Sequence, residues 1–77
     1  MPTYTVKIVN EHFTQSGEQE SLDNIEAWKS AISSAIAIGA DQVSHGSPFF
    51  GAEVMVTQGR EQLGRYVVSV GATLLKD

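Results

Sequence analysis

The chain has 77 residues, nine of them acidic and five basic, and it contains no cysteine. Without cysteine, neither a disulfide framework nor a thiolate metal site can stabilise it, and no apolar run reaches the roughly 20 residues that span a bilayer. The net charge of −4 argues against direct binding to nucleic acid, because Lys and Arg contacts to phosphate supply most of that affinity. We expect one domain over residues 1–77, held together by packing or by a partner subunit.

A first β-strand is predicted over residues 3–10, where apolar and polar side chains alternate. Tyr4, Val6 and Ile8 point to one side, and the residues between them point to the other. This pattern begins directly after the first residues, which lack the charged and apolar regions of a signal peptide. We therefore expect a soluble protein of the cytoplasm.

The next segment, residues 11–22, has a weaker pattern. Phe13 and Thr14 can begin a second strand that returns after a turn near residues 10–12. Ser16-Gly17 would then form a turn or a bulge.

Acidic residues gather at the same place in the chain. The stretch from Glu11 to Glu26 holds five acidic residues and no Lys or Arg. We interpret it as a solvated loop and helix start, because the helix dipole favours negative charge near its N-terminus. The alternative is a divalent-cation site, but the spacing matches no known cation-binding loop.

One long amphipathic helix is predicted from Asp23 to Gly46. Asp23 can accept the free amide hydrogens of the first turn, with Glu26 at capping-box spacing. Gly46 and then Pro48 indicate the end of the helix. Gly39 within the helix indicates either a close backbone contact or a break. An apolar stripe recurs at steps of three and four residues and is expected to face the sheet: Ile25, Trp28, Ile32, Ala35, Ile36, Gly39 and Val43.

Two further strands are predicted as a hairpin. Residues 49–58 and 62–72 both alternate, and residues 58–61 between them have the composition of a turn. The tail, residues 73–77, is expected to fray.

The order ββαββ indicates an α+β fold: a single antiparallel sheet of two hairpins, with one long amphipathic helix across one face. Opposite charges on the other face can pair across strands. The inward side chains are expected to close on the Trp28 side of the helix, and they are Tyr4, Val6, Ile8, Val54, Val56, Tyr66, Val68 and Val70.

Four stretches resemble a known family: Met1-Pro2-Thr3-Tyr4, the acidic helix start with Glu26-Ala27, residues 48–54 (PFFGAEV) and residues 64–71 (GRYVVSVG). The family consists of short alpha-proteobacterial proteins and is catalogued as a domain of unknown function. The resemblance covers nearly the whole chain. It implies a ββαββ fold and brings no activity, cofactor or catalytic residue.

No motif in the sequence indicates an enzyme. Ser44 and His45 are neighbours near a helix end, which does not direct one at the other, and no Gly-x-Ser-x-Gly elbow is present. Glu11 and His12, with Glu18 or Glu20 across a hairpin, are the conceivable metal ligands, but we interpret them as solvated. Gly59 to Gly64 has the spacing of P-loop glycines without the Lys-Ser/Thr that follows them, and we interpret it as a turn.

Self-association is expected instead, because one helix about 10 Å wide cannot cover a sheet whose four strands stand ~4.8 Å apart. Val9 is expected to be exposed on the far sheet face, and one of two consecutive phenylalanines must leave the core. The candidate interaction surface comprises Ile38, Phe49, Phe50, Met55 and Val67. In a two-fold dimer, Lys7 and Arg65 would meet Glu53 of the other subunit.

The function expected from the sequence is a non-catalytic structural or protein-interaction module that forms a homodimer and uses no cofactor. The alternative is a regulatory or antitoxin-like protein that acts with a nucleic-acid-bound partner, because small regulators share this layout. That alternative is an analogy of fold alone.

The charge balance generates one prediction. The chain should show no binding to a generic DNA duplex near physiological salt, because too few cationic groups exist to release counterions. Fluorescence anisotropy of a labelled duplex measures this. A micromolar complex that weakens steeply with added salt would contradict it.

Overall fold

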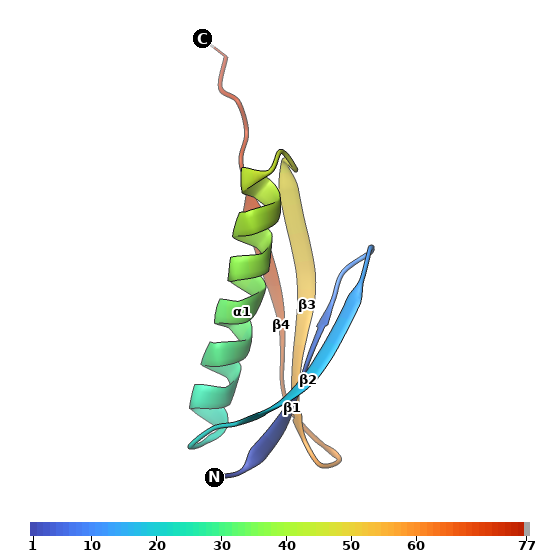
Figure 1. Cartoon of the computed structure of the whole chain (residues 1–77), viewed down its shortest axis with the longest axis vertical. Helices are drawn as coiled ribbons and strands as arrows, with labels where there is room; N and C mark the ends of the chain where they lie inside the picture. The colour runs from blue at the N-terminus through green and yellow to red at the C-terminus, as the bar shows by residue number, and fades with distance from the viewer. Residues whose placement is uncertain (77) are drawn as a thin grey trace.

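The computed structural model describes residues 1–76 and confirms the ββαββ order (Figure 1). All strand pairs are antiparallel, and together they form one open sheet in the order β2-β1-β3-β4. The elements are β1 (Thr3–Val9), β2 (Thr14–Glu20), α1 (Asn24–Ser44), β3 (Phe49–Gln58) and β4 (Glu61–Gly71).

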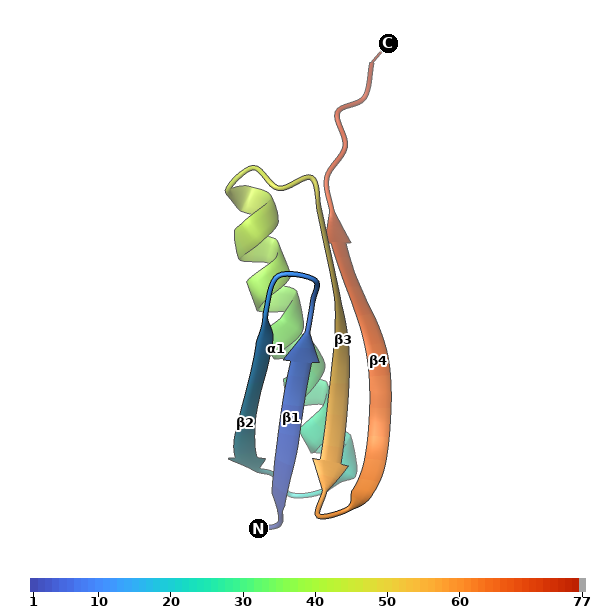
Figure 2. The same ribbon diagram turned by 90° about the vertical axis from the view of Figure 1, so that its right-hand side faces the viewer.

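The helix lies on one face of the sheet and does not cover it evenly. α1 packs mainly on β3 and β4, less on β1, and the β1–β2 hairpin diverges from it (Figure 1). Figure 2 looks onto the opposite face, which no helix covers. The structure is therefore a two-layer α+β arrangement in which β2 on the helix side and the whole opposite face of the sheet are without helix cover.

The core lies between α1 and the central strands. Val54 and Val56 of β3 are fully buried, and they stand opposite Ile8 and Val6 of β1 in the register. Tyr66, Val68 and Val70 of β4 stand opposite alternate residues of β3 on the same face, as predicted. The largest fully buried side chains are Tyr4, Phe50, Val54 and Val56.

The face that α1 turns to the sheet differs from the predicted stripe. The residues buried on the helix are Ala27, Ala31, Ala35 and Gly39, each four positions apart. Ile25 and Ile36, predicted to be buried, are 53% and 48% exposed. Ala35 and Gly39 of the predicted stripe are buried as predicted. The two isoleucines lie at the flank instead, because small residues allow the helix backbone to approach the sheet closely.

Trp28 keeps its predicted partner but not its predicted burial. Its ring lies 5.7 Å from that of Tyr66, centroid to centroid, with the planes inclined at 32°. The side chain is only half-buried, because Tyr66 belongs to the edge strand of the sheet.

Both predicted ends of the helix are confirmed. The Asp23 side chain accepts a hydrogen bond from the Glu26 N–H at 2.9 Å, which satisfies one free donor of the first turn. At the other end, Gly46 has a φ of 108°, and its N–H donates to the carbonyl of Val43. The next N–H, that of Ser47, donates to Gln42, so the last carbonyls are satisfied as in a glycine-capped helix end.

The second strand is confirmed, but the expected turn or bulge at Ser16-Gly17 is not present. These residues pair regularly with Lys7 and Val6 inside β2. The predicted turn near residues 10–12 is confirmed: the Asn10 N–H donates to the Phe13 carbonyl at 2.9 Å. Glycine here reflects an exposed edge strand rather than a turn.

The β3–β4 hairpin is confirmed with one irregularity. Gly59 has a φ of 60° in the tight turn, a backbone conformation that glycine adopts at no steric cost. Just after the turn the register shifts between Val56 and Thr57, leaving Leu63 as an extra residue in β4. From Gly64 to Gly71 the pairing is regular.

Gly39 does not break the helix; it allows a close contact. A Cβ at this position would lie 2.6 Å from Cδ2 of Phe50 and 2.8 Å from Cγ2 of Val70. Both distances are far shorter than van der Waals contact, so the sheet side chains occupy the space that any larger residue would need.

Replacing Gly39 with Ala is therefore expected to destabilise the protein. The gain in helix propensity is about 1 kcal/mol, and overpacking costs about 1–3 kcal/mol, so a net loss of up to about 2 kcal/mol in unfolding free energy should appear in urea denaturation. Gly17→Ala is the matched control, because no atom lies within 4 Å of a Cβ there. A Gly39→Ala variant more stable than wild type would contradict the close contact.

Candidate interaction surfaces

The uncovered side of the sheet carries several apolar side chains. Phe49 is 63% exposed and Val67 is 79% exposed, while Val9 and Met55 are half-buried beside them. The alternation of β1, β3 and β4 places these side chains on the face opposite to the core. We call this surface the open sheet face, and its residues are Thr5, Lys7, Val9, Phe49, Glu53, Met55, Arg65 and Val67.

An ion pair lies between the apolar residues of the open sheet face. Arg65 Nε lies 2.8 Å from one carboxylate oxygen of Glu53, and its Nη2 lies 3.2 Å from the other. The register places Met55 opposite Arg65 and Val67 opposite Glu53, so this bidentate pair crosses the β3–β4 ladder diagonally. The hydrogen bond from Arg65 holds the pKa of Glu53 below its ordinary value and raises that of Arg65.

This ion pair confirms that charges pair across the strands. One expectation changes, however. Arg65 was expected to meet Glu53 of a second subunit, but in the structure it binds Glu53 of its own chain.

The five residues of the predicted surface do not lie together. Phe49, Met55 and Val67 share the open sheet face. Phe50 is 1% exposed and stacks on Phe13 with ring centroids 6.5 Å apart. Phe49 is thus the phenylalanine that leaves the core, and Phe50 does not belong to an exposed surface, because strand alternation sends consecutive side chains to opposite faces. Ile38 is half-buried on α1, on the other side of the sheet.

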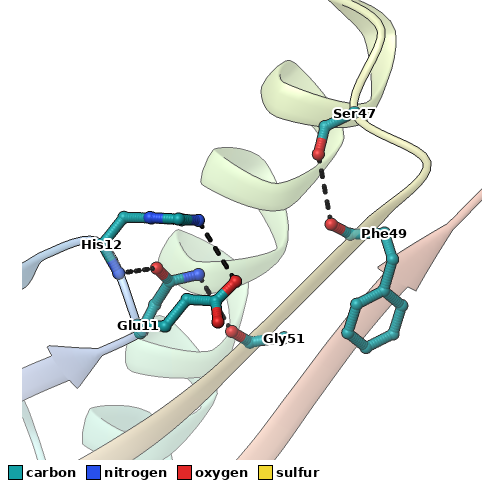
Figure 3. Close-up of polar contacts among 6 residues, drawn as sticks. Glu11, His12, Ser47, Phe49 and Gly51 are labelled. Carbon is teal, nitrogen blue, oxygen red and sulfur yellow. Dashed lines mark hydrogen bonds and ion pairs between the residues drawn. The ribbon is translucent and has the colours of Figure 1, made fainter.

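A polar pocket of about 300 Å³ lies beside Phe49, between the β1–β2 loop and the start of β3 (Figure 3). The Asn10 side chain donates to the Gly51 carbonyl at 3.0 Å and accepts from the His12 N–H at 2.7 Å. The Ser47 hydroxyl donates to the Phe49 carbonyl at 3.2 Å. The Asn10 side chain thus ties the β1–β2 loop to β3.

The residues weighed as metal ligands or catalysts are exposed. His12 Nε2 lies 3.1 Å from the Glu11 carboxylate, and both side chains are more than three-quarters exposed. His45 Nδ1 lies 2.7 Å from the carbonyl of Asp41. Within residues 1–76, no three His, Cys, Asp or Glu side chains converge as metal ligands would.

The sequence interpretation missed a second apolar surface, on the β4 side of α1. We call it the β4-side row, and it consists of Ile25, Ile32, Ile36 and Val43. Ile25 and Ile36 are the exposed members, and Ile32 and Val43 are half-buried against the core. Their spacing of seven, four and seven residues keeps them on one line of the helix. The sequence shows this spacing of apolar residues, but all four were predicted to belong to the buried stripe of the helix.

Comparison of the chain with models of protein families, with curated proteins and with solved structures found no match. The resemblance to the short alpha-proteobacterial family therefore stays a prediction. No helix among residues 1–76 combines the length and the apolar character needed to cross a membrane.

The ion pair generates a prediction about pH. Because the pKa of Glu53 is lowered on folding, its stabilising contribution is present above the ordinary value of 4.5 and is lost as the pH falls through the lower folded value. Arg65→Gln should raise the Glu53 midpoint in a carbon-13 NMR titration, and its stability difference from wild type should vanish in acid.

Lys7→Gln is the control for this titration. It removes a cation from the same face but not the hydrogen-bond donor, so the Glu53 midpoint should stay near that of wild type. An unchanged midpoint in Arg65→Gln would show that the bidentate pair does not persist in solution.

Proposed function

We propose that this protein is a non-catalytic protein-interaction module of the cytoplasm that self-associates as a homodimer. The observation that carries the proposal is the amount of large apolar surface left outside the core. Phe49 and Val67 on the open sheet face, and Ile25 and Ile36 on the helix, are all roughly half or more exposed. A chain this short has few other ways to increase its buried area.

The polar groups of the molecule support a non-catalytic role. Every buried side-chain nitrogen or oxygen within residues 1–76 has a hydrogen-bond partner inside the molecule. The two histidines are exposed and contact acidic neighbours, Glu11 and Asp41. The charges of Glu53 and Arg65 are already paired, because the Arg65 guanidinium donates hydrogen bonds to both carboxylate oxygens of Glu53.

Sedimentation equilibrium over micromolar to submillimolar concentration tests the proposal. The wild-type chain should show the mass of two chains at the upper end, with dissociation on dilution, because burial of the exposed side chains drives association. Ser33→Ala is the control, because Ser33 is exposed on the outer side of α1, away from both surfaces. The mass of one chain throughout would refute self-association.

A further inference from the structure

The two edges of the sheet differ in how they are protected. An edge strand presents unpaired N–H and C=O groups that can template another strand, and proteins block such edges with charge. On β2, a seven-residue edge, Glu18 and Glu20 repel a second copy of the same strand. β4 has eleven residues, and its segment from Tyr66 to Gly71 contains neither a charge nor a proline.

The β4-side row lies above this unprotected edge. Trp28, one turn before Ile32, stacks on Tyr66 of β4. The opposite flank of α1 faces the other hairpin, because the Gln19 side chain of β2 donates to the Ala27 carbonyl at 3.3 Å. The exposed isoleucines therefore lie on the flank of α1 that faces β4, away from the β1–β2 hairpin. Strand edge and helix row form one continuous margin of the molecule.

The β4-side row is symmetric about its own centre. Its spacing of seven, four and seven reads the same in both directions, with residue 34 at the midpoint. In an antiparallel two-fold arrangement, Ile32 would meet Ile36 of the second copy, and Ile25 would meet Val43. Such self-complementarity is what an isologous interface requires.

The strand and the helix can share one two-fold axis. Trp28 lies level with Tyr66, and Gly39 lies level with Val70. Residue 34, midway between those helix positions, is therefore level with about the middle of the segment from Tyr66 to Val70. A two-fold axis at Val68 pairs Tyr66 with Val70 of the second copy, and the same axis passes the centre of the helix row.

The distance across this axis also suits helix packing. α1 packs on both β3 and β4, so we place its axis between these two strands. Neighbouring strands stand ~4.8 Å apart, and the two-fold axis lies midway between the two paired β4 strands. With each helix axis above the middle of β3 and β4, the two-fold axis is ~4.8 Å from each helix axis, and the two helix axes are ~9.6 Å apart. That separation falls within the about 8–10 Å typical of packed helices.

We infer that a second copy of this chain docks along the free edge of β4. The two β4 strands pair antiparallel around Val68, and the β4-side rows of the two helices pack against each other. The inference rests on the proposed self-association and assigns it to this margin rather than to the open sheet face. The product is an eight-stranded sheet in which the two open sheet faces are continuous.

Helix variants test the interface by sedimentation equilibrium. Ile36→Glu should reduce the mass from two chains to one, because it places a charge opposite Ile32 of the second copy. Ala37→Glu is the matched control, because it adds the same charge at the next, exposed position on the outer side of α1, and it should remain a dimer. Circular dichroism of both variants shows whether they are folded.

Single-cysteine cross-linking tests the strand pairing without disturbing the helix, and the cysteine-free chain makes each introduced thiol unique. A short bis-maleimide should link Ser69→Cys, next to the axis, into a covalent dimer. Ser16→Cys, exposed on the opposite edge strand, should stay unlinked.

The outcomes separate the inference from the proposed function. A dimer that survives Ile36→Glu, or that links through Ser16→Cys and not through Ser69→Cys, overturns the β4 interface and leaves self-association standing. A dimer that Phe49→Ser dissociates and Ile36→Glu does not would assign the interface to the open sheet face. A wild-type chain that is monomeric throughout refutes both.

Discussion

The close approach of α1 to β3 and β4 is the contact on which the rest of the structure depends. Ala27, Ala31, Ala35 and Gly39 face the sheet, and the ring of Phe50 reaches into the space that a side chain at Gly39 would fill. Small residues gain little from burial themselves, but they bring the helix backbone near the large side chains of the strands. The consequence is that the bulky isoleucines of the helix are displaced to its flanks.

This contact also makes the molecule asymmetric. Because α1 is seated on β3 and β4, β2 receives little apolar cover, and polar bonds help to attach the β1–β2 hairpin to the helix. The Tyr4 hydroxyl donates to the Asn24 side chain at 3.1 Å, and Gln19 reaches the Ala27 carbonyl. The acidic, polar β2 is suited to an exposed edge. The apolar margin at β4 is what remains at the other end of the same sheet.

The two apolar surfaces differ in their chemistry. The open sheet face is interrupted by the Glu53–Arg65 pair, whose charges satisfy each other and would both lose water in a dry contact. The β4 margin has no charge between Tyr66 and Gly71 and offers backbone hydrogen bonds as well as side chains. The β4 margin is therefore the better surface for the proposed second copy of this chain, and the open sheet face remains accessible to solvent in that arrangement.

The sequence by itself determined the features that depend on neighbouring residues. Alternation set the strands, Asp23 and Gly46 set the limits of α1, and Gly59 set the hairpin turn, because each acts through local backbone geometry and hydrogen bonds. Tertiary structure decided which residues of the helix face the sheet, and that Ser16-Gly17 continues a strand. It also decided that Arg65 binds Glu53 of its own chain. Those outcomes depend on register and on the distance between layers, which arise only when β3 and β4 meet α1.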